Sequence, residues 1–91
     1  MSIVVRFNPT SLTAETYDSV SNQLKESEDW PPEGLDYHVC FGSDGSLKVS
    51  EIWDSREQFE AFGERLMPVL KDVGIDPGKP ELVEIHNIIK R

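Results

Sequence analysis

The sequence is poor in several features that would assign it quickly to a class. Its 91 residues contain one cysteine, Cys40, which excludes a framework of intrachain disulfides. No uninterrupted apolar run is longer than three residues, whereas a membrane-spanning helix needs roughly 20. The first residues lack the charged segment and long apolar stretch of a signal peptide. We therefore expect a cytoplasmic protein.

Basic residues are also few. The chain has 9 Lys and Arg against 17 Asp and Glu, for a net charge of -8. This balance opposes binding to the phosphates of nucleic acids, which requires clustered cations, and to anionic membrane surfaces. We expect neither a nucleic-acid nor a membrane partner. An apolar content of 37% and a charged content of 29% are typical of a globular protein, and the length predicts one domain over residues 1–91.

What the sequence does contain is an alternation of strand and helix patterns. A β-branched run predicts a first strand at residues 3–7. Thr13 is placed as the N-cap of a helix, and Tyr17, Val20 and Leu24 form one apolar stripe at helical spacing.

A predicted hairpin follows the helix-breaking prolines at 31–32. Residues 35–42 and 46–53 have strand character, and Ser43-Asp44-Gly45 between them predicts a tight turn.

The last part of the chain predicts a helix and a strand. Ser55 and Gln58 have the spacing of a capping box, and an apolar stripe with helical spacing follows them. Pro68 lies inside this stripe, so we expect it to kink or split the helix. Gly74 is placed as the helix stop, and residues 81–89 as the final strand.

The resulting β-α-β-β-α-β order predicts an α+β protein of ferredoxin-like fold, with a four-stranded antiparallel sheet and both helices on one face. Strand alternation divides the side chains between two faces, although the register of strand 46–53 is ambiguous because its more apolar face contains Glu51. The set expected to face the helices is Ile3, Val5, Phe7, Tyr37, Val39, Phe41, Val83, Ile85 and Ile89. The set expected on the opposite face is Val4, Arg6, His38, Cys40, Leu47 or Val49, Glu51, Trp53, Glu84, His86 and Ile88.

Both faces of this sheet carry apolar residues, but two helices can cover only one. A large apolar face is rarely left to water. We therefore expect a second copy of the chain to cover it, giving a homodimer in which the two sheets close into a barrel.

Two histidines are the candidate catalytic residues. His38 and His86 could each act as a general base or a ligand to a metal or haem, because histidine titrates near neutrality. Each could equally be a hydrogen-bonded residue that orders a strand or the dimer seam. Neither belongs to a zinc-binding spacing, so we expect no metal site.

The candidate substrate-binding residues are Arg6, Glu51 and Trp53. Arg6 could hold an anionic substrate, or pair with Glu51 or Glu84. Trp53 could stack on an aromatic ligand, or belong to the core or interface. A few polar groups on apolar walls are typical of a small-molecule pocket. Cys40 is expected to be a small buried residue.

Three stretches, at 34–39, 49–62 and 83–87, resemble the dimeric α/β-barrel superfamily and its antibiotic-biosynthesis-monooxygenase-like branch. The pattern Trp-x-Ser-x-x-x-Phe-x-x-Phe at 53–62 is the most specific of them. The resemblance implies a homodimeric, small-molecule-binding barrel, acting as a cofactor-independent monooxygenase or isomerase on an aromatic or polyketide-like substrate. The alternative is a non-catalytic ligand-binding or accessory dimer.

The same resemblance bears on cofactors. Haem-degrading members use an Asn, a Trp and a haem-ligating His on a helix. Asn8 and Trp53 match the first two, but neither predicted helix contains a His. We therefore expect no haem and no other cofactor, with Asn8 as a weaker candidate for the site.

Overall fold

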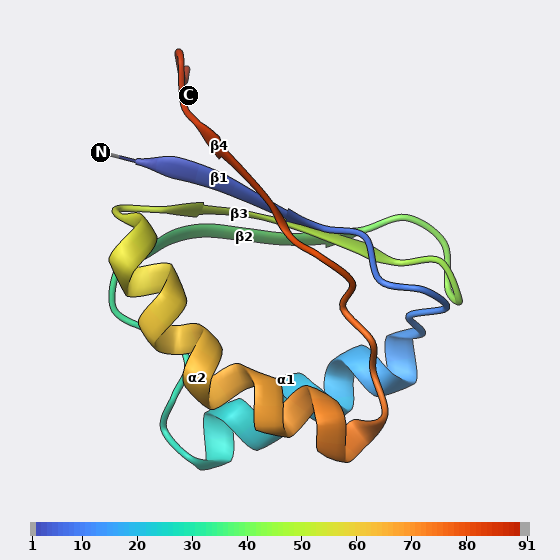
Figure 1. Ribbon diagram of the computed structural model, residues 1–91. Helices are drawn as coiled ribbons and strands as arrows, with labels where there is room; N and C mark the ends of the chain where they lie inside the picture. Colours follow the sequence, from blue (N-terminus) through green and yellow to red (C-terminus); the bar gives the residue numbers. More distant parts are fainter. Residues whose placement is uncertain (1, 90–91) are drawn as a thin grey trace.

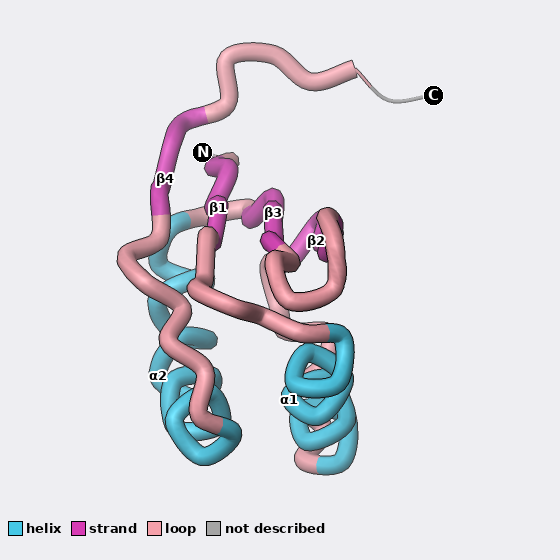
Figure 2. The backbone as a smooth tube through the Cα atoms, turned by 90° about the vertical axis from the view of Figure 1, so that its right-hand side faces the viewer, coloured by secondary structure: helices cyan, strands magenta, loops and turns pink. Residues whose placement is uncertain are grey.

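The computed structural model describes residues 2–89 and has the predicted order of elements (Figure 1). The elements are β1 (Ile3–Phe7), α1 (Ala14–Glu26), β2 (Leu35–Phe41), β3 (Lys48–Trp53), α2 (Arg56–Val73) and β4 (Glu81–Glu84). The strands form one antiparallel sheet in the order β2-β3-β1-β4. Both helices lie on the same side of this sheet, as the two views in Figures 1 and 2 show. The predicted α+β, ferredoxin-like fold is confirmed.

Local signals set the ends of the helices. Thr13 caps α1: its hydroxyl accepts from the backbone N–H of Thr16, and the Thr16 side chain bonds back to Thr13. The Ser55 hydroxyl accepts from the N–H of Gln58, but the Gln58 side chain returns to that hydroxyl rather than to the backbone, so the predicted capping box is only half formed. α2 ends at Gly74, whose φ of 88° is the left-handed conformation that glycine favours.

Of the two outcomes expected at Pro68, a kink or a split of the helix, the split does not occur. α2 is one helix from Arg56 to Val73, although its ribbon changes direction along its length (Figure 1). Proline removes one backbone donor, so the carbonyl of Glu64 loses its helical partner. Because Glu64 and Pro68 are both exposed, water can satisfy that carbonyl. The helix therefore tolerates the proline.

The core lies between the sheet and the helices. Its most buried side chains are Val5, Trp53 and Phe62, and the rings of Phe59 and Phe62 pack on the Trp53 indole at 5.6 and 5.7 Å between centroids. This arrangement confirms the apolar stripe of α2 as core.

The side chains divide between two faces of the sheet, which we call the covered face, under the helices, and the open face. Directly paired residues of antiparallel strands share a face. Val5 pairs with Glu51 and His38 pairs with Glu51, so all three lie on the covered face. The covered face comprises Ile3, Val5, Phe7, Leu35, His38, Cys40, Val49, Glu51, Trp53 and Leu82. The open face comprises Val4, Arg6, Tyr37, Val39, Phe41, Lys48, Ser50, Ile52, Glu81 and Val83.

The predicted faces of the second and third strands were therefore wrong. Tyr37 and Phe41, expected under the helices, are 58% and 41% exposed, while Glu51 and Trp53 are 5% and 0% exposed. A register shift between Leu35 and Tyr37 puts an extra residue into β2, so these two residues point to opposite faces despite their spacing of two. The polar residues of the covered face are hydrogen-bonded, as described below, which makes their burial affordable.

The final strand also differs from its prediction. β4 ends at Glu84 instead of Ile89, and beyond it the chain runs away from the helices (Figure 2). Val83 pairs with Val4 and lies on the open face, not under the helices. Ile89 is almost fully exposed, so it takes no part in the core.

Candidate functional site

A cavity of about 80 Å³ lies between the covered face and the helices. Its walls are mostly apolar, with Phe7, Trp30 and Phe62 among the largest side chains. Four polar residues interrupt these walls: Tyr17, Ser21, His38 and Glu51. A few convergent polar groups in an apolar cavity are typical of a ligand site.

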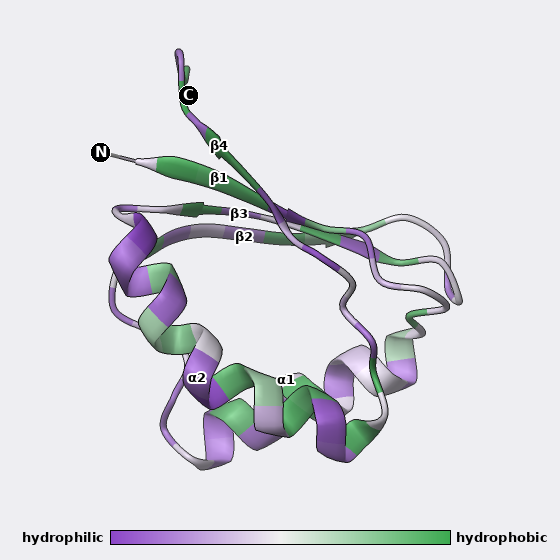
Figure 3. Ribbon diagram, viewed as in Figure 1, coloured by the Kyte–Doolittle hydropathy of each residue, from purple (hydrophilic) through white to green (hydrophobic). Residues whose placement is uncertain are grey.

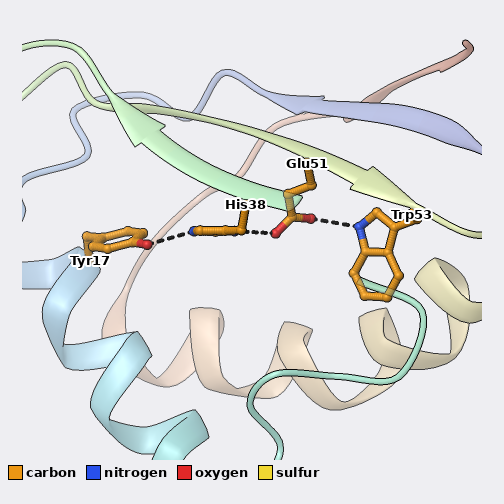
Figure 4. Close-up of polar contacts among 4 residues, drawn as sticks. All are labelled: Tyr17, His38, Glu51 and Trp53. Atoms are coloured by element: carbon orange, nitrogen blue, oxygen red, sulfur yellow. Dashed lines mark hydrogen bonds and ion pairs between the residues drawn. The ribbon is translucent and has the colours of Figure 1, made fainter. Parts of the chain in front are cut away.

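Four side chains at this cavity form a continuous chain of hydrogen bonds (Figure 4). The Tyr17 hydroxyl lies 2.6 Å from His38 Nε2. His38 Nδ1 lies 2.6 Å from Glu51 Oε2. Glu51 Oε1 accepts from the indole N–H of Trp53 at 3.0 Å. Every member of the chain therefore has a partner.

The fold supplies this geometry from three elements. His38 on β2 and Glu51 on β3 are directly paired, which brings imidazole and carboxylate together on the covered face. Trp53 lies two residues beyond Glu51 on the same strand, so it shares this face. Tyr17 reaches the histidine from the first turns of α1.

With His38 as a neutral imidazole, the hydrogen bonds indicate one arrangement of protons. The Trp53 indole can only donate, and a carboxylate can only accept, so both Glu51 oxygens receive N–H groups. This assigns the His38 ring proton to Nδ1 and leaves Nε2 as the acceptor for the Tyr17 hydroxyl. Burial, above all, raises the pKa of Tyr17 from its ordinary 10.0, which keeps the phenol protonated and able to donate.

This series of hydrogen bonds gives His38 the properties of a general base. A carboxylate bonded to Nδ1–H holds the tautomer and orientation, and it would stabilise the imidazolium that forms when Nε2 takes up a proton. The edge of the His38 imidazole and the ring of Trp30 meet at 84°, with centroids 5.0 Å apart. These contacts fix the imidazole at the cavity wall.

Three of the five predicted site residues come together here, and two do not. His38, Glu51 and Trp53 form the chain, but Trp53 lies behind Glu51 and does not line the cavity. Arg6 lies on the open face, and His86 is exposed in a bend after β4. The predicted convergence of both histidines and Arg6 on one cavity is therefore wrong for this chain.

Arg6 belongs instead to a separate hollow of about 420 Å³ at one end of the open face. Lys48, Lys79 and Glu81 also line it, as does Asn8, the weaker sequence candidate. Neither Arg6 nor Asn8 reaches the cavity, because side chains alternate between faces along β1 and Asn8 follows its end.

Sequence reasoning missed two residues of the cavity. Tyr17 was assigned to the apolar stripe of the first helix, and Trp30 was not among the candidate site residues. A tyrosine in an apolar stripe is itself a signal, since its buried hydroxyl requires a polar partner.

The remaining reactive side chain at the sheet is Cys40. It shares the covered face with His38 and is half-buried, and burial raises the pKa of its thiol. A raised pKa lowers the thiolate fraction and makes a nucleophilic role unfavourable. Within residues 2–89 no three His, Cys, Asp or Glu side chains gather as metal ligands would. Neither helix in this part of the chain is long and apolar enough to span a membrane.

Comparisons with known proteins show where this fold has been seen before. No family model matches the sequence, and no curated protein matches it. Solved structures do match. SnoaB, a cofactor-independent oxygenase from Streptomyces nogalater, superimposes with a TM-score of 0.65 at 16% identity, over 99% of this chain and 96% of that chain. The monooxygenase from the gene ActVA-Orf6 of Streptomyces coelicolor, in complex with nanaomycin D, gives 0.62 at 15%, over 99% and 91%.

The fold alone does not determine an activity. Foldit4, a de novo designed protein, also matches, with a TM-score of 0.55 at 15% identity over 90% of this chain and 93% of that chain. Function must therefore be argued from the site. What the similarity establishes is architectural: this chain has the ferredoxin-like fold of the antibiotic-biosynthesis-monooxygenase structures.

Proposed function

We propose that this chain forms a homodimeric barrel that binds a small aromatic or polyketide-like molecule and oxidises it as a cofactor-independent monooxygenase. The observation that carries the proposal is the His38 imidazole, oriented by the buried Glu51 carboxylate and facing an apolar cavity. SnoaB supports this reading, because it is a cofactor-independent oxygenase with the same fold.

The reaction that suits this site begins with proton removal. His38 Nε2 would take a proton from an acidic CH2 group flanked by aromatic rings, and Glu51 would stabilise the resulting imidazolium. The carbanion would give its electrons to O2 and form a C–O bond. The peroxide formed, after regaining a proton, would lose water and leave a carbonyl. In sum, one CH2 group and one O2 become one carbonyl and one water.

The residues of the site would divide this work. His38 would be the base and Glu51 the residue that positions it. Trp53 would act through Glu51 by donating to its second oxygen, since its buried indole has no access to a ligand. Apolar walls exclude water from the carbanion and strengthen each electrostatic interaction in the site.

The homodimer is supported by the open face. Tyr37, Val39 and Phe41 on β2 are all exposed in the single chain, and Val83 on β4 is 47% exposed. Figure 3 shows apolar residues along the strands as well as along the helices. Apolar residues concentrated on one uncovered sheet face mark an interaction surface. A second copy offers the same flat face and would cover it isologously.

Oxygen uptake with anthrone as the substrate tests the activity, and Glu51→Gln is the decisive variant. The glutamine keeps the shape of the side chain, but its amide N–H would face His38 Nδ1. The ring proton would then move to Nε2, which could no longer accept a proton. We expect oxygen uptake to fall by about a hundredfold or more.

His86→Ala is the matched control, because this second histidine is exposed and does not line the cavity. We expect its oxygen uptake to stay within about twofold of the wild type. Unchanged uptake in Glu51→Gln would remove His38 as the base.

A non-catalytic ligand-binding or accessory dimer is the second candidate. One observation favours it. Each polar side-chain atom of the four hydrogen-bonded residues, Tyr17, His38, Glu51 and Trp53, has a hydrogen-bond partner, as in a purely structural network. A wild-type protein that binds anthrone without consuming oxygen would support this second candidate.

A further inference from the structure

The cavity beside His38 is too small for the ring it is proposed to bind. It measures about 80 Å³. An engineered apolar cavity that holds benzene measures about 150 Å³. Entry of an aromatic ring therefore requires one of the wall residues to move.

Tyr17 is the wall residue that stands directly in the way. Its hydroxyl takes the only free lone pair of His38, at Nε2, and its ring lies nearly parallel to the imidazole, at 22° with centroids 6.0 Å apart. Because Nδ1 is held by Glu51, His38 has no nitrogen left for a ligand while Tyr17 is in place.

Tyr17 is also a wall residue that can turn outward more easily than the buried aromatic residue Phe62. It lies at the fourth position of α1 and is half-buried, so a change of its χ1 rotamer moves the ring outward without unfolding the helix. Phe62, by contrast, is 2% exposed and packs against two tryptophan rings. If the Tyr17 side chain turned outward, it would leave a space with the shape of a phenol. His38 Nε2, which bonded the Tyr17 hydroxyl, would lie at one end of this space.

We propose that the Tyr17 phenol occupies the subsite of the ligand's own hydroxylated ring, so that binding exchanges one phenol for another at His38 Nε2. This deepens the proposed function and rests on it for the chemistry that follows binding. The ligand it specifies is a planar ring with a hydroxyl group, which donates to Nε2 as Tyr17 does. Tyr17 is then a specificity-determining residue, because it competes with the ligand for the subsite. The ligand's apparent affinity is its intrinsic affinity multiplied by the fraction of time that Tyr17 leaves the subsite free.

The exchange is tested with two small probes of similar shape, phenol and toluene, and two variants. Tyr17→Ala empties the subsite, whereas Tyr17→Phe removes only the hydroxyl and leaves the ring in place. Binding is measured from chemical-shift changes in two-dimensional NMR spectra. We expect Tyr17→Ala to bind phenol about tenfold or more tightly than the wild type does, and more tightly than it binds toluene. Tyr17→Phe loses the hydrogen bond that holds its ring in the subsite but keeps the ring, so it should bind phenol more tightly than the wild type and less tightly than Tyr17→Ala.

Two results would overturn the proposal. One is a folded Tyr17→Ala protein that binds phenol no better than the wild type. The other is equal affinity of this variant for phenol and toluene. Equal affinity would mean that the vacated space binds any small ring and does not recognise the hydroxyl group. If Tyr17→Ala does not fold, Tyr17→Leu, which keeps an apolar helix-forming residue while still shortening the side chain, is held to the same two criteria.

This experiment involves no turnover, so its outcome is independent of oxygen chemistry. Tighter phenol binding by Tyr17→Ala without any oxygen uptake by the wild type would leave the exchange in place and remove the monooxygenase. Oxygen uptake by the wild type with no gain in phenol binding would remove only the exchange.

Discussion

Each of the two faces of the sheet departs in part from the usual distribution of residues. The covered face buries a carboxylate and an imidazole, whereas the open face exposes a tyrosine, a phenylalanine and two valines. The covered face can hold charge because each polar atom meets a partner within 3.0 Å. The open face can expose apolar groups only at a cost in free energy, which a second copy would remove. Polarity alone therefore does not tell the inside of this protein from its outside.

The largest expected effect lies on the covered side. Phe62→Ala removes an aromatic side chain that packs against Trp30 and Trp53, and should lower the free energy of unfolding by about 3–5 kcal/mol. Urea denaturation measures it. Glu60→Ala, on the exposed side of the same helix, should cost less than about 0.5 kcal/mol. Similar losses in the two variants would mean that the helix does not bury the face described.

The next largest effect concerns the open face. The wild type should elute with a mass of about twice 10.3 kDa by light scattering at micromolar concentration. Val39→Glu places a charge between the exposed rings of Tyr37 and Phe41 on β2 in both copies, and should weaken the dimer by about 2–3 kcal/mol or more. The variant should therefore elute at about half the wild-type mass. A wild type that is monomeric at that concentration would contradict the barrel, whereas a dimeric Val39→Glu would place the interface elsewhere.

The smallest effect measures what the buried polar chain contributes to stability. Tyr17→Phe removes the hydrogen bond to His38 and should cost about 0.5–1.5 kcal/mol at about pH 8. Because burial raises the pKa of Tyr17, the folded state keeps this proton more tightly than the unfolded state. Its stabilising contribution is complete below the ordinary value of 10.0 and is lost as the pH rises through the folded-state pKa.

The difference between the wild type and Tyr17→Phe should therefore shrink between about pH 8 and about pH 11. The control is Tyr37→Phe on the open face, whose hydroxyl makes no hydrogen bond within residues 2–89. Its cost should stay below about 0.5 kcal/mol at the lower pH. A difference for Tyr17→Phe that grows with pH would contradict the direction of the pKa shift.

Element order was predictable because it depends on local signals. Thr13, Ser55 and Gly74 mark helix ends through backbone groups that lie within a few residues, and those signals hold whatever the rest of the fold does. Local signals could not decide between a kink and a split at Pro68, for the opposite reason. The free-energy cost of Pro68 depends on whether water can bond the Glu64 carbonyl that lost its helical partner. That depends on which side of the helix faces solvent in the fold.

The candidate site was predictable only in its residue types. His38, Glu51 and Trp53 were singled out as polar or aromatic groups on strands, but their assignment to the open face was wrong. On β2 the set opposite to His38 is the more apolar one, so hydrophobicity turned the wrong set toward the helices. Composition does not reveal the hydrogen bonds that make the burial of His38 and Glu51 stable. Arg6 and His86 were grouped with them on the assumption of an unbroken alternation.

The sequence by itself determined the order of strands and helices, the antiparallel ferredoxin-like topology, and the surplus of apolar surface on the sheet. These follow from short-range periodicity, capping and the handedness of connections. Only the tertiary structure decided which face of β2 and β3 lies under the helices, and so which polar residues meet. That choice depends on pairings between His38 and Glu51 and between Tyr17 and His38, 13 and 21 residues apart. Burial of a charged group becomes stable only when such distant partners are already in place.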